Sequence, residues 1–327
     1  MLHYFIRRLL YMLALLIGVS IFAFFLIELP PGSYVDTHIA QLEQEGQTVN
    51  KAEIESLKKR YGLDQPTYVR YFKWMGGMLR GDMGISYQWN QPVTDIIAER
   101  LPTTIAVALL SALFTYAVAI PIGIYSAVRQ YSIGDYVFTV LGFIGMAIPH
   151  FFFAMVLMVF SFKWFGISVG GLFSPEYLTA PWSMGKFIDL LKHLPIPMIV
   201  IGLAGAAGLI RVMRACLLDE LQKQYVTTAR ARGVSEIKLL FKYPVRLALN
   251  PIISTVGWLL PRLVSGTVVV AIVMNLPTLG PVLFGALKSQ DTYLAGSIVL
   301  FLTVLTVIGV FLSDVLLAIT DPRIRYE

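Results

Sequence analysis

Long uncharged runs alternate with short polar segments along most of the chain. A helix of about 20 apolar residues is long enough to cross the ~30 Å hydrocarbon core of a bilayer. Six apolar runs meet or approach this length, the fifth of them interrupted by Arg262, and they are residues Leu9–Ile27, Leu101–Val128, Tyr136–Phe162, His193–Ile210, Leu247–Met274 and Thr292–Ser313. The hydrophobic pattern therefore predicts an all-α integral membrane fold with six transmembrane helices.

One long polar segment, residues 30–100, separates the first two predicted spans. Asn50 and Glu53 stand at capping-box spacing before a helical pattern that Gly62 is suited to end. The stretch from Tyr68 to Leu79 carries aromatic and Met residues at the spacing of an amphipathic helix, which favours a position at headgroup depth. The same stretch could instead pack as a cap on the helical bundle or contact a partner.

The distribution of charge predicts which ends of the spans face the cytoplasm. With both termini inside, the cytoplasmic segments hold thirteen Lys and Arg and the short external segments hold four. This bias obeys the positive-inside rule, in which segments longer than about 60 residues count little. We therefore predict cytoplasmic N and C termini and an extracytoplasmic helical segment between spans 1 and 2. The predicted division is residues 1–29 with the N-terminus and first span, residues 30–100 outside, and residues 101–327 as the core of five spans.

The cytoplasmic loop of residues 216–246 has the most distinctive pattern in the chain. It contains six Lys and Arg against three acidic residues. Gly233 is expected to end one short helix, and Ser235 is placed to cap a second. Two short helices joined by a tight turn would form a rigid protrusion for a partner protein. A basic loop that only satisfies topology and lipid headgroups has the same composition.

This loop resembles the cytoplasmic signature loop of ABC-importer permeases, in the branch that serves peptide and nickel uptake. Tyr225, Thr228, Ala229 and Gly233 fit the pattern Y-x-x-T-A-R-A-K-G of that branch, with Arg232 in place of Lys. Further matches occur in order along the chain, and they are Gly62-Leu63-Asp64-x-Pro66, Gly77-x-Leu79-x-Gly81-Asp82-x-Gly84, Asn250-Pro251 and the closing Asp321-Pro322-Arg323. The wider permease consensus more often has Glu and Ala where this chain has Thr227 and Thr228.

The resemblance implies a role for the loop and a set of partners. The residues expected to couple the chain to an ATPase are Tyr225, Thr227, Thr228, Ala229, Arg230, Ala231, Arg232, Gly233, Ser235 and Glu236. The implied partners are a second homologous permease, two ATP-binding subunits, an extracytoplasmic solute-binding protein and the lipid bilayer, without nucleic acid. The chain would be a multi-pass protein of a bacterial or archaeal cell membrane, and a transport subunit rather than an enzyme. It would hold no cofactor or metal of its own, with ATP-Mg bound on the ATPase subunits.

A few polar residues stand inside or beside the apolar runs. Arg262 lies roughly midway along the fifth span, where an unpaired guanidinium costs from about 2.5 to above 10 kcal/mol. It is a candidate for the translocation pathway, or else for a structural ion pair or carbonyl clamp. His150, Ser265 and Asn275 are further pathway candidates, although a lone His within a bundle is more often a packing residue.

Several classes of protein are excluded or disfavoured by what the sequence lacks. It contains no phosphate-binding G-x-x-x-x-G-K-[ST] loop, no HExxH, no GxSxG and one cysteine, Cys216. A secondary carrier or channel is the alternative of another class, but we find no internal repeat and no acidic residue inside the apolar runs. The solute of the importer is predicted to be oligopeptide-like. Oligosaccharide is the alternative, because Ala271 replaces a Glu that is common in the family.

Overall fold

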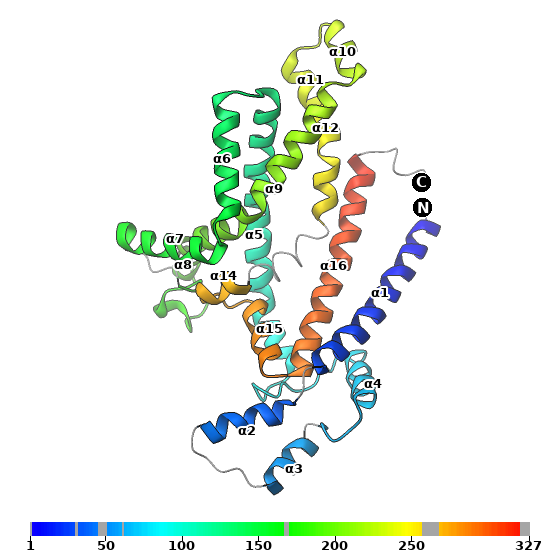
Figure 1. The fold of residues 1–327 in the computed structure, drawn as a ribbon, viewed down its shortest axis with the longest axis vertical. Helices are drawn as coiled ribbons and strands as arrows, with labels where there is room; N and C mark the ends of the chain where they lie inside the picture. The colour runs from blue at the N-terminus through cyan, green and yellow to red at the C-terminus, as the bar shows by residue number, and fades with distance from the viewer. Residues whose placement is uncertain are drawn as a thin grey trace. The chain divides into compact units, whose positions relative to one another are not determined.

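The computed structural model describes residues 2–29, 32–44, 51–60, 62–166, 170–256 and 268–320. Within these ranges the chain is helical and contains no β-strand, only an isolated bridge between Ile85 and Pro92. The order of the helices can be followed in Figure 1. The chain forms two compact units, each described by itself. Unit 1 comprises Met1–Thr104 and Thr278–Val307, and unit 2 comprises Ile105–Pro277 and Ile308–Glu327.

Unit 1 is built on the long first helix and on parts of two others. Its helices are α1 (Leu2–Glu28), α2 (Tyr34–Gln44), α3 (Lys51–Arg60), α4 (Thr67–Met78), α15 (Leu279–Lys288), the start of α5 (Val93–Val128) and the first half of α16 (Thr292–Thr320). The largest core cluster joins α1, α5, α15 and α16 through fully buried residues such as Val93, Leu279 and Ile298. A second cluster packs Phe24 of α1 against Tyr71 and Trp74 of α4.

The burial of Tyr71 and Trp74 modifies the interfacial helix that the sequence predicts over Tyr68–Leu79. These two rings face the protein, where the Tyr71 hydroxyl lies 2.9 Å from the Ser20 hydroxyl and the Trp74 indole N–H donates to Ser297 Oγ at 3.2 Å. Phe72 and Leu79 remain exposed, at 69% and 83%. The helix is therefore amphipathic as predicted, with its aromatic face divided between the core of unit 1 and the exterior.

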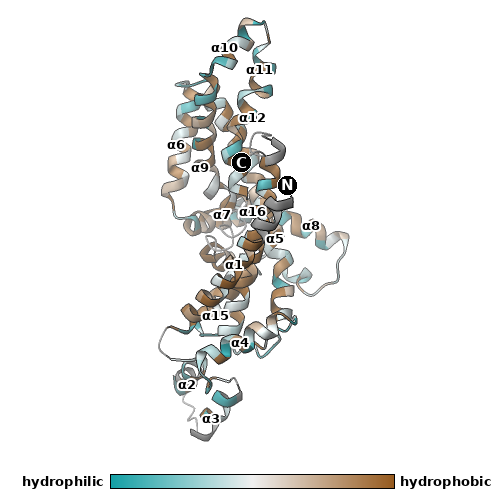
Figure 2. Cartoon of the chain, turned by 90° about the vertical axis from the view of Figure 1, so that its right-hand side faces the viewer, coloured by the Kyte–Doolittle hydropathy of each residue, from teal (hydrophilic) through white to brown (hydrophobic). Residues whose placement is uncertain are grey.

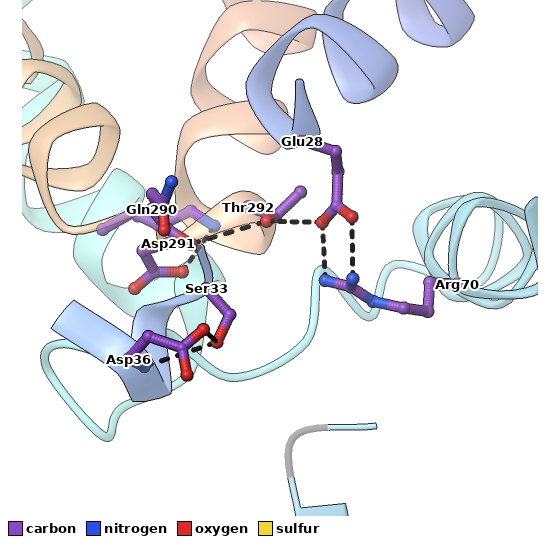
Figure 3. A network of polar contacts seen from close by, with 8 residues as sticks. Glu28, Ser33, Asp36, Arg70, Gln290, Asp291 and Thr292 are labelled. Carbon is purple, nitrogen blue, oxygen red and sulfur yellow. Dashed lines mark hydrogen bonds and ion pairs between the residues drawn. The ribbon is translucent and has the colours of Figure 1, made fainter. Parts of the chain in front are cut away.

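A buried polar network fixes α4 to the ends of α1 and α16 (Figure 3). The Arg70 guanidinium makes two contacts with the Glu28 carboxylate, at 2.7 and 2.6 Å, and both side chains are largely buried. Thr292 Oγ1 donates a hydrogen bond to the same carboxylate, to Glu28 Oε1, at 2.9 Å. The neighbouring Asp291 is fully buried and accepts hydrogen bonds from the Ser86 hydroxyl and from backbone N–H groups. Paired and hydrogen-bonded charges of this kind are the form in which ions persist in protein interiors.

Unit 2 contains the remaining helices. They are the C-terminal part of α5, α6 (Ile133–Ala147), α7 (His150–Phe165), the 3-10 turn η1 (Pro175–Tyr177), α8 (Met184–His193), α9 (Pro195–Leu221), α10 (Gln224–Ala231), α11 (Glu236–Lys242), α12 (Pro244–Ala248), α14 (Val268–Val273) and the end of α16. α9 is its central element, with α6, α7, α8 and α12 packed along it. Where α5 and α9 cross, Thr115 Oγ1 donates to the carbonyl of Gly202 at 2.8 Å, because Gly202 leaves room for close approach.

The structure changes the third predicted span. The sequence predicts one helix over Tyr136–Phe162, but α6 and α7 are separate and their axes differ by 103°. The break lies at Ile148, which is extended, and Pro149. Proline has no N–H to donate and disfavours helical backbone at the residue before it, which is why the single-helix prediction is wrong.

The other predicted spans agree with the structure to different degrees. α1, α5 and α16 are each long and apolar enough to cross a membrane, and α1 in particular is apolar along most of its length (Figure 2). α9 begins two residues after the predicted start at His193 and continues to Leu221, past the predicted end at Ile210. The fifth span contains residues 257–267, including Arg262 and Ser265, which lie outside the described residues. A second bend, of 50°, separates Met184–Leu203 from Gly205–Leu221. Counting this pair and the α6–α7 pair as one span each gives at most five described spans, so the sixth stays a prediction.

Candidate functional site

The loop predicted from residues 216–246 folds into two short helices, α10 and α11, beyond the ends of α9 and α12 (Figure 1). The turn between them is a Schellman motif. The N–H of Gly233 bonds to the Arg230 carbonyl at 3.0 Å, and the N–H of Val234 bonds to the Ala229 carbonyl at 3.3 Å. Gly233 adopts φ = +76°, the left-handed conformation that a residue without Cβ takes at low cost. The predicted helix break at Gly233 is thus confirmed.

Ser235 occupies the position before α11, as the sequence predicts, but not with the predicted bond. Its backbone is extended, with φ = −60° and ψ = 141°, and its side chain makes no capping hydrogen bond. Instead, the first turn of α11 contains Glu236, whose negative charge suits the N-terminal end of a helix dipole.

Arg230 and Glu236 close the turn with an ion pair. Arg230 Nε donates to Glu236 Oε1 at 2.5 Å and Arg230 Nη2 donates to Oε2 at 3.0 Å. The geometry is bidentate, the arrangement in which Arg binds a carboxylate with most directional specificity. The Arg230 guanidinium lowers the pKa of the Glu236 carboxyl through this hydrogen bonding. Both side chains are exposed, at 53% and 65%, so the pair fixes geometry more than it adds stability.

The base of this elbow is fixed to the helices below it. The Tyr225 hydroxyl donates to Glu220 Oε2 at 2.5 Å, which ties the first turn of α10 to the last turn of α9. Burial raises the pKa of Tyr225, which therefore stays a neutral donor at physiological pH. Val226 and Leu239 are completely buried under the two helices. Beneath them, Met213 and Leu217 of α9 pack with Val245 of α12 in an apolar cluster.

The outer surface of the elbow carries most of the predicted coupling residues. Tyr225 and Ala229 are partly buried, whereas the exposed members are Thr227, Thr228, Arg230, Ala231, Arg232, Gly233, Ser235 and Glu236. Two further residues on α11 belong to this surface, because Ile237 is 76% exposed and Phe241 is 58% exposed. Their i, i+4 spacing places them on one face of α11. The sequence contained this signal, but the predicted set omitted both residues.

A second ion pair joins α9 to α6. Arg214 Nε donates to Asp135 Oδ1 at 3.0 Å and Arg214 Nη2 donates to Oδ2 at 2.9 Å. Asp135 is 3% exposed and also accepts a bond from the Tyr131 backbone N–H at 3.0 Å. The pair therefore fixes the start of α6 to the same helix that leads into the elbow. Sequence analysis did not identify it, because the two residues are 79 positions apart.

The two candidate pathway residues that the structure describes, His150 and Asn275, do not line the same cavity. His150 begins α7 and lines an apolar cavity of about 360 Å³ between α5, α6, α7 and α9, with Phe138, Gly142, Val200 and Ala207 among the other lining residues. Asn275 is exposed after α14, with φ = +51°, and does not line that cavity. Among the described residues, no group of three or more His, Cys, Asp or Glu could hold a metal ion.

Comparisons with known proteins cover nearly the whole chain. Residues 119–326 match the family described as "Binding-protein-dependent transport system inner membrane component", and residues 1–108 match the N-terminal family of the same membrane components. The oligopeptide transport system permease protein AppB of Bacillus subtilis is 36% identical over 99% of both chains. A putative peptide permease protein of Brucella ovis is 33% identical over 99% of both chains. The dipeptide transport system permease protein DppB of Escherichia coli is 28% identical over the full length of both chains.

A solved structure resembles this fold as well. A chain of the MetNI methionine ABC transporter, in inward-facing conformations, superposes with a TM-score of 0.52 at 16% sequence identity. The likeness covers 69% of this chain and 96% of that one. At this level of identity it supports the helical arrangement only.

Proposed function

Because the chain belongs to the family of binding-protein-dependent transport system inner membrane components, we propose that the α10–α11 elbow is the surface through which ATPase subunits drive it. The chain is a multi-pass inner-membrane permease subunit of a bacterial ABC importer. The observation that carries the proposal is the construction of the elbow. Its turn is fixed by Gly233 and by the Arg230–Glu236 pair, and its base is fixed by Tyr225 and two buried residues.

A coupling surface needs to be both rigid and accessible, and the elbow meets both conditions. The exposed side chains on α11 combine Ile237 and Phe241 with Lys238 and Lys242. Exposed apolar side chains next to charged ones are typical of a protein–protein interface, which has an apolar centre and a polar rim. The proposed occupant is one of two ATP-binding subunits, which would also carry ATP-Mg, while this chain contributes no cofactor.

The complete importer would contain this chain, a second homologous permease, the two ATPases and an extracytoplasmic solute-binding protein. We propose six spans with both termini in the cytoplasm, which puts the elbow on the ATPase side. The Lys and Arg distribution supports this orientation. The fifth span would be Leu247–Met274, of which 257–267 lie outside the described residues.

The proposed solute is oligopeptide-like. AppB is named as an oligopeptide transport permease and DppB as a dipeptide transport permease, and both align over nearly the full length of this chain. Arg262 and Ser265, together with Asn275 and His150, remain the proposed pathway residues. Of these, His150 has a direct structural argument, since it is the one ionisable side chain among the residues that line the apolar cavity.

The test is ATP-dependent uptake by proteoliposomes that contain the purified importer. A labelled oligopeptide and a labelled oligosaccharide would each be supplied with the solute-binding protein. The proposal expects accumulation of the peptide only when both ATPase subunits and ATP are present. Accumulation by this chain in the absence of ATPase subunits would favour a self-contained carrier and contradict the proposal. Uptake of the oligosaccharide but not of the peptide would agree with an ABC importer and would contradict the proposal that its solute is oligopeptide-like.

A further inference from the structure

The helix α8, immediately before the membrane helix α9, has its polar side turned inward. Lys186, Asp189 and His193 are 8%, 7% and 3% exposed. These residues follow one another at i, i+3 and i+7, so they lie on one face of the helix. In a surface helix of a water-soluble protein the polar face is the one that is exposed, so α8 is inverted relative to that pattern.

Each buried polar group of α8 has a partner in the protein. Lys186 Nζ donates to the Ala180 carbonyl at 2.6 Å and lies 5.0 Å from the centre of the Phe173 ring. Asp189 accepts two hydrogen bonds from Ser174, one from the backbone N–H and one from the hydroxyl, both at 2.7 Å. His193 Nδ1 lies 2.8 Å from the Asp189 carbonyl oxygen. These contacts fix the rotation of α8 about its own axis.

The close approach of the preceding turn fixes α8 further. Tyr177 packs directly against Gly185. A Cβ on Gly185 would lie 2.8 Å from the Tyr177 hydroxyl oxygen, a distance too short for a real Cβ contact, so the position requires glycine in this packing. Ser183 caps the helix by accepting a bond from the Lys186 N–H at 3.2 Å. The orientation of the outward face is therefore determined by the fold of residues 174–186 and does not depend on a partner.

That outward face is apolar along its whole length. Met184, Phe187, Ile188 and Leu191 are 73%, 48%, 47% and 51% exposed. Their spacing of i, i+3, i+4 and i+7 makes one continuous stripe. Trp182, just before the helix, is 70% exposed. The hydropathy of α8 can be followed in Figure 2.

We propose that this stripe lies in the bilayer, at the boundary between headgroups and acyl chains, so that α8 is a lipid anchor. Three residues, Lys192, His193 and Leu194, separate Leu191 at the end of this stripe from Pro195, the first residue of the apolar helix α9, so the stripe adjoins membrane-embedded surface. A Trp at the edge of such a surface is typical of the membrane interface. Lys192 is the exposed charged residue of α8, and its long side chain can reach lipid phosphates while its methylenes stay in apolar surroundings.

Lipid accounts for these features better than a second protein does. A protein partner would be expected to find some polar group to pair with, whereas the polar groups of α8 other than Lys192 are already bonded inside the protein. The inference rests on the membrane location of the chain and is independent of the proposed solute and of the ATPases.

The experiment measures where α8 lies relative to lipid and water. Cys216 is the one cysteine of the chain, so Cys216→Ser provides a background for single-cysteine variants. Nitroxide labels are placed by Phe187→Cys, Ile188→Cys or Leu191→Cys in the chain purified with its native subunits and reconstituted into nanodiscs of phosphatidylethanolamine and phosphatidylglycerol. Collision rates with oxygen, which concentrates in lipid, are compared with those for a water-soluble nickel chelate. Val200→Cys provides a buried reference, and Arg80→Cys, in unit 1, provides an exposed reference.

The proposal expects high oxygen collision and low nickel collision at residues 187, 188 and 191, with a shift toward nickel at Lys192→Cys. Strong nickel collision along the stripe would place it in water and overturn the proposal. Protection from both reagents, as at residue 200, would place the stripe against a protein and overturn it as well. Hydroxyl-radical footprinting of the unmodified chain gives an independent measurement, because oxidation of Met184 and Trp182 at the rate of free side chains would contradict lipid burial.

Discussion

The sharpest prediction concerns Gly233, where the cost of an unusual backbone conformation can be separated from the cost of steric crowding. A Cβ built on Gly233 would meet no atom within 4 Å, so the added Cβ itself causes no collision. The cost of substitution comes from φ = +76°, since the left-handed conformation costs an L-residue roughly 1–2 kcal/mol. For a β-branched residue the same conformation is a genuine outlier. Gly233→Val should therefore weaken the turn between α10 and α11 without disturbing the spans.

The magnitude follows from the size of that penalty. A loss of about 1–2 kcal/mol changes a two-state ratio by a factor of about 5–30. The open form of the elbow should become more populated by that factor, while the buried residues below it stay packed. Insertion and assembly are expected to remain normal, but ATP hydrolysis should no longer be matched by uptake.

The assay combines two measurements on the purified importer. Hydrogen exchange at the amides of Gly233 and Val234 reports the opening of the turn, because both amides are bonded to carbonyls of α10. The ratio of peptide taken up to ATP hydrolysed reports coupling. Gly233→Asn is the matched control, since Asn tolerates the left-handed conformation and also ends helices at this position.

Two outcomes would refute the reasoning. If Gly233→Val kept the original exchange rates, the turn would not depend on the left-handed glycine. If exchange rose but the coupling ratio stayed unchanged, the elbow would not transmit force. Equal loss of coupling in the Val and Asn variants would indicate that the glycine surface itself matters, for example by close contact with a partner.

Three further predictions test the contacts around the elbow and in unit 1. Exchanging the charges as Arg230→Glu with Glu236→Arg should restore most of the uptake that either single change removes. Because the lowered pKa of Glu236 keeps it charged, the native pair is complete above the ordinary carboxyl pKa and is lost as pH falls through the lowered value. Tyr225→Phe should raise exchange in the first turn of α10 through loss of about 1 kcal/mol. Glu28→Ala leaves the buried Arg70 without the carboxylate that it pairs with, so thermal unfolding should show a destabilisation of about 3–5 kcal/mol. Replacing both Glu28 and Arg70 by Met should recover part of that loss.

The sequence identified the elements whose signals are local. The apolar runs of α1, α5 and α16 could be found by length alone, and the turn at Gly233 could be found because glycine following a short amphipathic segment is a known helix stop. Pro149 was visible as well. Whether such a proline kinks a membrane helix or ends it is not decided by the local sequence, and here α6 and α7 are separate helices whose axes differ by 103°.

Long-range pairs could not be predicted from a single sequence. Asp135 and Arg214, or Glu28 and Arg70, come together only when helices distant in sequence pack in one register. The inversion of α8 was missed for a related reason. Its apolar stripe is regular, but periodicity does not tell which face is turned outward, and that is decided here by the partners of Lys186 and Asp189.

Within unit 2, the contacts form a continuous mechanical connection from the elbow to the cavity. α10 is tied through Tyr225 to the end of α9, and α9 is tied through Arg214 to Asp135 at the start of α6. α6 ends at the break before His150, and both sides of that break line the apolar cavity. A displacement of the elbow would therefore move α9 and α6 together, while the extended residue Ile148 can absorb a change of angle. Packed helices with ion-paired ends transmit such a displacement because their interiors resist compression. If the elbow is displaced as proposed, the extended backbone before Pro149 is where the angle between α6 and α7, and with it the shape of the cavity, can change.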